Sequence, residues 1–335
     1  MQNHDIRHQN TITALRFVHL FGWLRVVELS TLMKPHTATA LEAGARLARS
    51  LISRRLVLAR RLPEGAGQVL VLATAGVRLL AEFGICAVSG KGIGRAMGQH
   101  WIPSMAWKHD VLAHAVLAEL HKRGYEVLPE AEIRRRADPM AKLPDGLARA
   151  PDGSWLWLEV ENARKSGIHM RRLADAITAV SAGQVEVCGV RPTRSLVAYV
   201  GSSFDERGHR LNHRGRVCKA IAAAARSDVQ LVFAECKRKG AAGIASIVLV
   251  NATVAADRAS AILKRLDASG WYHDADSGVT KAHYGSCTAY VWQDSDVPRT
   301  WSYDADGDGC VSGAAGYAGS INEAKRCAAA LIASR

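Results

Sequence analysis

A chain of 335 residues is long enough for two or three small domains, each with its own core. Its formal net charge of +13 favours a polyanionic partner, most simply nucleic acid, held by an attraction that weakens with salt. The sequence contains neither an apolar run long enough to span a bilayer nor a basic amphipathic anchor with exposed aromatic residues. We therefore expect a nucleic-acid-binding protein rather than a membrane protein.

The cysteines argue against two further classes of protein. All seven are scattered singly, and none belongs to a Cys-x-x-Cys pair, so a zinc ribbon and a disulfide framework are both unsupported. Dispersed thiols favour a reducing compartment, and the polar residues 1–8 do not form a signal peptide. We expect the protein to be cytoplasmic.

The first part of the chain has the element order of a winged helix-turn-helix domain, which we place at residues 8–84. The predicted helices lie at residues 11–21, at 25–33 and from a cap at Thr37 or Thr39 to about 54, and the predicted hairpin strands at 56–59 and 69–72. Its basic side chains would meet the phosphates and groove edge of double-stranded DNA. They are Arg46, Arg49, Arg54, Arg55, Arg60 and Arg61. A small helical domain with a solvated basic face is the alternative.

Residues 85–107 predict a flexible linker. The run Gly90-Lys-Gly-Ile-Gly94 suggests a P-loop, but the upstream glycine spacing is wrong. Gly92 also stands where a Ser or Thr would have to hold the metal ion. We therefore exclude a P-loop.

Three carboxylates carry the clearest chemical signal. Predicted strands at 142–148 and 155–161 are joined by an Ala-Pro-Asp-Gly turn, which brings Asp145 near Glu159 and Glu161. The two glutamates share a face because alternate residues of a strand point the same way. Converging carboxylates suit Mg²⁺ or Mn²⁺, and such a site suits phosphodiester hydrolysis. An ordinary hairpin with solvated acids is the alternative.

This arrangement resembles the PD-(D/E)XK nuclease superfamily, whose pattern is Pro-Asp, a spacer and then acid-x-Lys. Pro144-Asp145 and Glu159 match, but Glu161 occupies the place of the Lys. Some members of that superfamily carry Glu at this place, and in others the Lys has moved to a nearby helix. Lys165 is the candidate for such a migrated Lys. Because Glu161 replaces the Lys of the motif, the sequence leaves open which residue would activate the attacking water.

The elements around the carboxylates predict the αβββαβ core of that superfamily, a three-layer α/β unit with a mixed sheet, which we place at residues 108–270. The predicted elements are a helix at 109–120, a strand at 125–128, the two strands above, a helix at 168–180, a strand at 196–200, a helix at about 214–226 and a strand at 229–233. Residues 271–335 predict a small β-β-α module to which we assign no chemistry. The expected fold class is thus α/β (α+β, multidomain).

A narrower resemblance covers about residues 10–240. A winged helix, a linker, His109-Asp110 at a helix start, Pro144-Asp145-Gly146 and Glu159-Val-Glu-Asn162 follow one another as in the replication-relaxation family. That family includes the MobC-type relaxases of mobilisable plasmids. The resemblance implies a metal-dependent nuclease fold that nicks or holds plasmid DNA at a transfer or replication origin.

Three other residue patterns suggest chemistry. His109 is a candidate general acid or base, because a histidine titrates near neutrality. Glu235-Cys-Lys237 is a literal acid-x-Lys, but no Pro-Asp precedes it at the usual distance, so we predict a basic surface turn. Residues 304–309 resemble the start of an EF-hand loop, but Ala315 stands where the bidentate Glu is needed, so we predict a hairpin turn.

Two functions remain open from the sequence. The first is a DNA-binding, metal-dependent endonuclease, a site-specific nickase of a plasmid or other mobile element, in which Asp145 and Glu159 hold Mg²⁺ or Mn²⁺. Glu161 or Lys165 would then activate the attacking water, and His109 would assist proton transfer. Cleavage through a covalent protein–DNA intermediate is the alternative to metal-assisted hydrolysis. The alternative is a non-catalytic winged-helix regulator with a degenerate nuclease fold. A defence or toxin nuclease with little site preference is a weaker third hypothesis, and a homodimer or other mobile-element proteins would be further partners.

Overall fold

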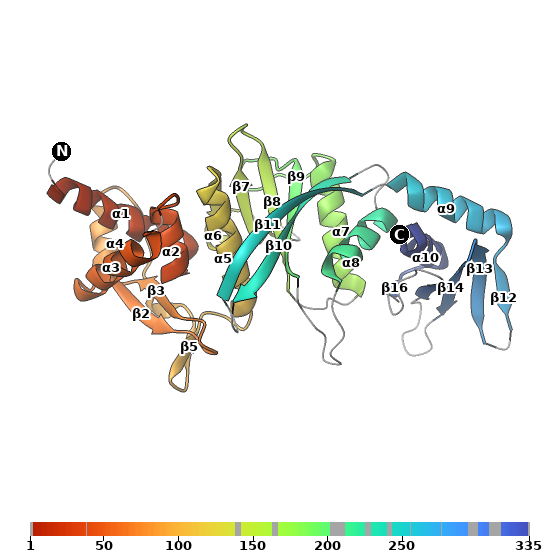
Figure 1. The fold of residues 1–335 in the computed structure, drawn as a ribbon, viewed down its shortest axis with the longest axis horizontal. Helices are drawn as coiled ribbons and strands as arrows, with labels where there is room; N and C mark the ends of the chain where they lie inside the picture. The colour runs from red at the N-terminus through yellow and green to blue at the C-terminus, as the bar shows by residue number, and fades with distance from the viewer. Residues whose placement is uncertain are drawn as a thin grey trace. The chain divides into compact units, whose positions relative to one another are not determined.

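The computed structural model describes residues 3–37, 39–137, 142–162, 167–201, 212–224, 229–239, 243–254, 256–275, 277–293, 301–307 and 316–333. Over these residues the protein is a mixed α/β structure with ten α-helices and four β-sheets (Figure 1). None of the described helices is both long and apolar enough to cross a bilayer.

The chain divides into two compact units. The first comprises Met1–Glu161, Glu186–Val200 and Ala234–Leu249, and the second Asn162–Val185, Gly201–Phe233 and Val250–Arg335. The first unit therefore holds the amino-terminal helices together with the strands that carry the predicted carboxylates.

The amino-terminal part of the first unit follows the predicted order of helices and strands, with one strand added. Its elements are α1 (Asn3–Phe21), β1 (Trp23–Arg25), α2 (Val26–Met33), α3 (Ala40–Ser53), β2 (Val57–Arg61), β3 (Gln68–Leu72) and α4 (Thr74–Ala81). The strands form an antiparallel sheet in the order β1-β3-β2. Helices α2 and α3 approach closely at Gly44, where a Cβ atom would lie 1.9 Å from Oγ of Ser30. A glycine is therefore required at this helix contact.

Residues 85–107, expected to be a flexible linker, instead carry packed structure. A short 3₁₀ turn, η1 (Gly90–Gly92), precedes the antiparallel hairpin of β4 (Arg95–Met97) and β5 (His100–Ile102). Trp101 and Ile102 are 7% and 3% exposed and belong to one core cluster with residues of the β2–β3 hairpin. The glycines suggested flexibility, but the apolar end of β5 anchors the segment.

The central sheet has six strands in the order β11-β10-β9-β8-β7-β6. Its strands are β6 (Glu126–Pro129), β7 (Gly146–Arg149), β8 (Trp155–Glu161), β9 (Arg194–Val200), β10 (Val229–Lys239) and β11 (Gly243–Val254). Strands β6, β7 and β8 are antiparallel, whereas β8 and β9 are parallel. Helix α5 (Trp107–Lys122) precedes β6, and α7 (Gly167–Ser181) joins β8 to β9. The predicted order of one helix, three strands, one helix and one strand is present, with the unpredicted helix α6 (Glu130–Arg136) inserted after β6.

Helix α5 packs against β7 and β8 through small and apolar residues. A Cβ atom at Gly146 would lie 3.0 Å from the side chain of Leu117, so α5 sits close to the start of β7. The turn between β7 and β8 is the predicted one, since the N–H of Gly153 donates to the carbonyl of Ala150 at 2.9 Å. Gly153 adopts φ 87°, which a residue with a side chain rarely does.

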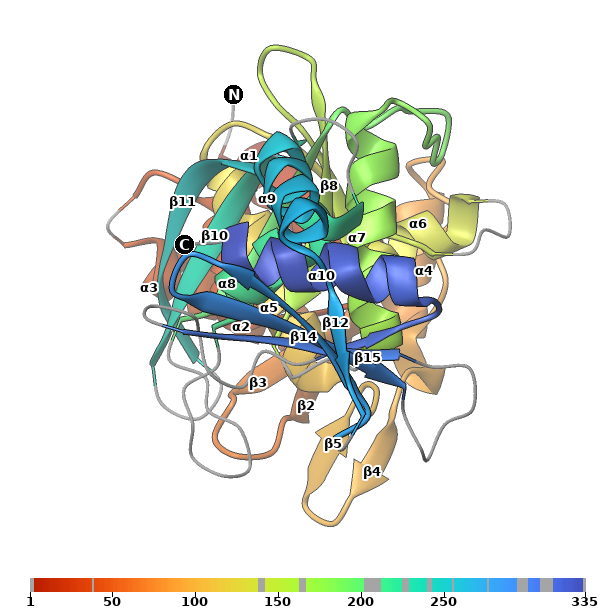
Figure 2. The same ribbon diagram turned by 90° about the vertical axis from the view of Figure 1, so that its right-hand side faces the viewer.

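The second unit contains α7, α8 (His213–Ala224), α9 (Ala256–Ser269) and α10 (Ile321–Ala333), together with an antiparallel sheet. The sheet strands are β12 (Tyr272–Asp274), β13 (Val279–Tyr284), β14 (Cys287–Gln293), β15 (Trp301–Gly307) and β16 (Gly316–Ala318), in that order. Helix α10 lies against β14 and β15 (Figure 2). The predicted hairpin turn at 304–309 is wrong up to Gly307, because those residues continue β15, and residues 308–309 lie outside the described part.

A buried histidine lies where the amino-terminal helices meet α5. The ring of His114 is 5.1 Å from that of Phe21 and 4.6 Å from that of Trp23, and its side chain is 8% exposed. Burial, opposed by the charge of Asp110 and supported by those of Arg25 and His109, lowers the pKa of His114 to about 4. The ring is therefore neutral in the folded protein at physiological pH.

Acidification is expected to destabilise the protein through His114. Because its pKa is lower when folded, the unfolded chain binds the proton first, and stability falls as the pH drops from about 6.5 towards about 4. The difference between the pKa of His114 in the unfolded chain and in the folded protein corresponds to a loss of about 3 kcal/mol in the free energy of unfolding. Urea unfolding of the wild type and of His114→Leu at pH 7.5 and pH about 4.5 measures it. The variant should lose clearly less stability on acidification, and an equal loss in both proteins would contradict the assignment.

Candidate active site

Asp145 directly precedes β7 and is fixed to β8 by both its backbone and its side chain. Its N–H donates to the carbonyl of Leu158 at 2.9 Å, and its Oδ2 accepts from the N–H of Val160 at 2.7 Å. The carboxylate of Asp145 thus accepts a hydrogen bond from β8 that a backbone carbonyl would otherwise accept in a β-sheet. The third contact of Asp145 is with Nε2 of His109, 3.1 Å from Oδ2.

Glu159 is fully buried on β8 and is bound at both oxygens. The ammonium of Lys142 lies 2.7 Å from Oε2, and the indole N–H of Trp157 donates to Oε1 at 2.6 Å. Burial raises the pKa of Glu159 to about 7, and the charge of Asp145 adds to the effect while Lys142 opposes it. Two carboxylates that influence each other in this way, one of them with a strongly raised pKa, are typical of functional sites.

His109 lies at the start of α5 between two carboxylates. Its Nδ1 is 3.5 Å from Asp110 and its Nε2 is 3.1 Å from Asp145, and Asp110 in turn accepts from Oγ of Ser104 at 2.8 Å. Burial would lower the pKa of His109, but the hydrogen bonds and charges of Asp110 and Asp145 outweigh it and raise the pKa to about 10. His109 is therefore a cation at neutral pH, which differs from the acid or base near neutrality that we expected.

The same contacts keep Asp145 ionised. Burial by itself would raise the pKa of Asp145, but the hydrogen bond and charge of His109 hold it below its usual range. The N–H of Val160 and the charge of Lys142 act in the same direction. Near neutral pH the site thus combines one firmly charged carboxylate with one, Glu159, that is close to its titration point.

The structure brings Asp145 and Glu159 together but does not gather three ligands. Glu161 lies on the same face of β8 as Glu159 and is 1% exposed. Within the described ranges, no set of three or more His, Cys, Asp or Glu side chains is arranged to hold one metal ion. The shared metal site of Asp145, Glu159 and Glu161 stays a prediction. In this structure Asp145 accepts from the N–H of Val160, and Glu159 is bound by Lys142 and Trp157. Lys165 lies outside the described residues.

Lys142 is the site residue that the sequence analysis missed. It stands three positions before Asp145, and no acid-x-Lys spacing marks it, because it reaches Glu159 through space from the segment before β7. Its side chain is 30% exposed while that of Glu159 is 1% exposed, so the ammonium lies between the buried carboxylate and the solvent. The only sequence cue was a basic residue at the start of the Pro-Asp segment.

The Glu235-Cys-Lys237 segment is a second correction. We expected a surface turn, but these residues lie inside β10, which continues to Lys239. The hydroxyl of Tyr199 on β9 donates to Glu235 at 3.3 Å, and Tyr199 stands opposite Glu161 in the β8–β9 register. The polar residues of β8 therefore continue across β9 to β10.

The basic residues predicted to contact DNA are all exposed. They are Arg46 and Arg49 on α3, Arg54 and Arg55 directly after it, and Arg60 and Arg61 on β2. Arg46 and Arg49 are three residues apart and share one face of α3. Arg54 is tied to α1, since its Nη1 donates to Oγ1 of Thr11 at 3.2 Å.

No family model, curated protein or solved structure matches this chain.

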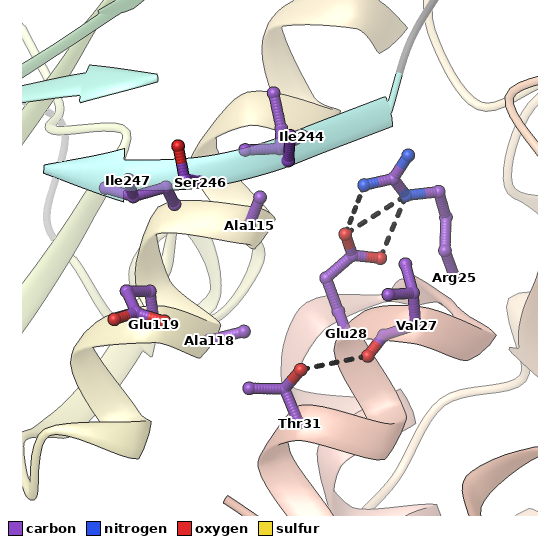
Figure 3. A pocket seen from close by; sticks show the side chains of 11 residues that line it. Arg25, Val27, Glu28, Thr31, Ala115, Ala118, Glu119, Ile244, Ser246 and Ile247 are labelled. Carbon is purple, nitrogen blue, oxygen red and sulfur yellow. Dashed lines mark hydrogen bonds and ion pairs between the residues drawn. The ribbon is translucent and has the colours of Figure 1, made fainter. Parts of the chain in front are cut away.

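A cavity of about 340 Å³ lies elsewhere in the first unit, between α2, α5 and β11 (Figure 3). The ion pair of Arg25 and Glu28, which are 5% and 3% exposed, forms one side, and Ile244 and Ile247 of β11 form another. None of the residues that line this cavity belongs to the Asp145–Glu159 pair or its partners. The cavity is therefore separate from the candidate active site.

Proposed function

We propose that this chain is a DNA-binding, divalent-metal-dependent endonuclease that acts as a relaxase-like, site-specific nickase of a plasmid or other mobile element. The observation that carries the proposal is the pair of Asp145 and Glu159 on neighbouring strands, with Lys142 beside it. A buried carboxylate next to a charged one is costly, and such arrangements are retained mainly where they serve a function.

The amino-terminal part supports DNA binding. The order α1-β1-α2-α3-β2-β3 is that of a winged helix-turn-helix, in which the helix at the position of α3 enters the major groove. Arg46 and Arg49 are exposed on α3, and Arg60 and Arg61 on the hairpin that follows. These positions suit contacts with base edges and phosphates, respectively.

The central part supports a PD-(D/E)XK-like fold. Three antiparallel strands, a crossover helix and a parallel strand occur in the order expected of that core. Asp145 stands at the start of β7 and Glu159 in β8, which are the places of the Pro-Asp and the first acid of the motif. The resemblance to replication-relaxation proteins rests on the sequence order of a winged helix, His109-Asp110, Pro144-Asp145-Gly146 and Glu159-Val-Glu-Asn162 with Lys165-Ser166.

The residues present fit a Mg²⁺ or Mn²⁺ ion. Mg²⁺ is usually held by one or two carboxylates, with its other positions left to water and substrate phosphate, and Asp145 and Glu159 offer those two. When bound, the ion supplies an activated water and neutralises charge that develops on the phosphate. Lys142 would place its ammonium against the phosphate once Glu159 turns to the ion, and His109 would hold Asp145 in position.

The test is an assay of supercoiled DNA carrying the origin of the protein's own element, incubated with the protein and Mg²⁺. A relaxed circle is expected with Mg²⁺ and none with EDTA. Supercoiled DNA that stays intact with Mg²⁺ and with Mn²⁺ would reject the nuclease assignment.

One observation favours the second candidate, a non-catalytic winged-helix DNA-binding regulator. Each carboxylate is already neutralised by a cation of the chain, Asp145 by His109 and Glu159 by Lys142. Such pairs would stabilise a degenerate nuclease fold without any metal. A protein that binds operator-like DNA tightly but neither binds metal nor cleaves would support this candidate.

A further inference from the structure

A second hairpin projects beside the β2–β3 hairpin in the first unit. Strands β4 and β5 are joined by the two residues Gly98 and Gln99, with Gly98 at φ 58°, as a tight hairpin turn requires. Strand β5 lies against β2. Both hairpins lie on the same side of the amino-terminal region in two perpendicular views (Figure 1, Figure 2). The two hairpins are therefore neighbours on one side of the amino-terminal region.

The β4–β5 hairpin is held firmly at its base. Trp101 is buried, and its indole N–H donates to the carbonyl of Ile93 at 3.1 Å. The chain enters the hairpin at Gly94, which adopts φ 71°. A Cβ atom added at this position would lie 2.3 Å from the carbonyl oxygen of Ile102. Only a glycine fits there. The hairpin is thus positioned relative to the β2–β3 hairpin through their common core cluster.

The outer part of the hairpin is exposed, and two basic residues lie at its base and in the η1 turn before it. Residues 95–99 are all exposed, and Met97 next to the turn is 48% exposed. Residues 83–109 contain Lys91, Arg95 and Lys108 but no Asp or Glu. Lys108 pairs with Glu64 at 2.7 Å, whereas no ion pair joins Lys91 or Arg95 to any described carboxylate. Two exposed cations are therefore available to an anionic partner.

We propose that the β4–β5 hairpin, together with the η1 turn before it, is a second DNA-contacting element, with Lys91 of η1 and Arg95 of β4 on phosphates of the duplex that α3 and the β2–β3 hairpin bind. The inference rests on the proposed DNA binding. Duplex DNA is the occupant because the hairpin adjoins the exposed arginines of β2 and carries the same sign of charge. Met97 at the tip is an apolar side chain of the kind that proteins place against the minor groove.

The test compares binding of a labelled duplex of about 30 base pairs by fluorescence anisotropy at several salt concentrations. The proteins are the wild type, the Lys91→Ala/Arg95→Ala variant, and a control that loses two exposed cations elsewhere, Lys122→Ala/Arg191→Ala. Loss of two phosphate contacts lowers the slope of log K against log salt by about 2 and raises the Kd roughly 50-fold at about 0.1 M salt. The control should keep a slope close to that of the wild type.

The outcomes separate this inference from the proposed function. If the wild type binds with a steep salt dependence and the hairpin variant binds in the same way, the hairpin does not contact DNA and the inference is overturned while the DNA-binding function stands. If the wild type shows no salt-dependent binding, both fail. An equal drop in slope for the hairpin variant and the control would also overturn the inference, since general charge would then explain the effect.

Discussion

Asp145→Asn and Glu159→Gln are each expected to lower DNA cleavage by about 10³-fold or more while leaving DNA affinity nearly unchanged. A metal-bound nucleophile and the charge stabilisation that accompanies it contribute several kcal/mol to such a reaction, and each 1.36 kcal/mol is about tenfold in rate. These substitutions keep the shape of the side chain. Asn at 145 retains an oxygen that can accept from the N–H of Val160, so the hydrogen bond between the start of β7 and β8 is preserved.

The control for these variants is Glu126→Ala on β6. Glu126 lies on the same sheet, but its side chain is 73% exposed and its ion pair with Arg149 is long, at 3.5 Å. Removing it changes the charge of the sheet edge without touching the candidate active site. Rates of relaxed-circle formation from supercoiled DNA, measured beside thermal unfolding, give the comparison. Full cleavage by both active-site variants would contradict the assignment of Asp145 and Glu159.

Arg46→Ala/Arg49→Ala is expected to raise the Kd for duplex DNA by at least about 100-fold at about 0.1 M salt. Both arginines are exposed on one face of α3, the helix that would lie in the major groove. They would supply base-edge contacts as well as charge, so preference for the cognate site should fall together with affinity. Anisotropy titrations with the cognate duplex and with an unrelated duplex measure both effects.

Two results would contradict the role of Arg46 and Arg49 in reading base edges. If the double variant binds both duplexes as tightly as the wild type, α3 is not the recognition helix. If it loses affinity for both duplexes by the same factor, the two arginines contact phosphates rather than bases.

Local patterns predicted most of the helices and long strands. Apolar residues located α2, α3, α5 and α7 to within a few residues. Strand β1 was missed, since its three residues run directly into α2 and form no pattern of their own. The β4–β5 hairpin was mistaken for a linker because the glycines of the Gly90–Gly94 run suggested flexibility, whereas Gly94 adopts the positive φ that the entry to the hairpin requires.

The candidate site was predictable only in part, for a physical reason. Asp145 and Glu159 are brought together by the pairing of β7 with β8, which the turn residues 150–153 predict from the sequence. The partners of the two carboxylates reach them through space. Lys142 comes from the irregular segment before β7, and its contact with Glu159 depends on the path of the backbone. The expected role of His109 also changed, because Asp110 and Asp145 together keep it charged, a joint effect that neither neighbour reveals alone.

The most direct test of the central claim is a calorimetric titration of Mn²⁺ into the full-length protein and into the Asp145→Asn/Glu159→Gln variant. Both proteins should first be shown to be folded and to bind duplex DNA. Saturable binding by the wild type and its loss in the variant is the predicted result. An absence of binding by the wild type, or equal binding by both proteins, would contradict the claim that these two carboxylates hold the catalytic ion.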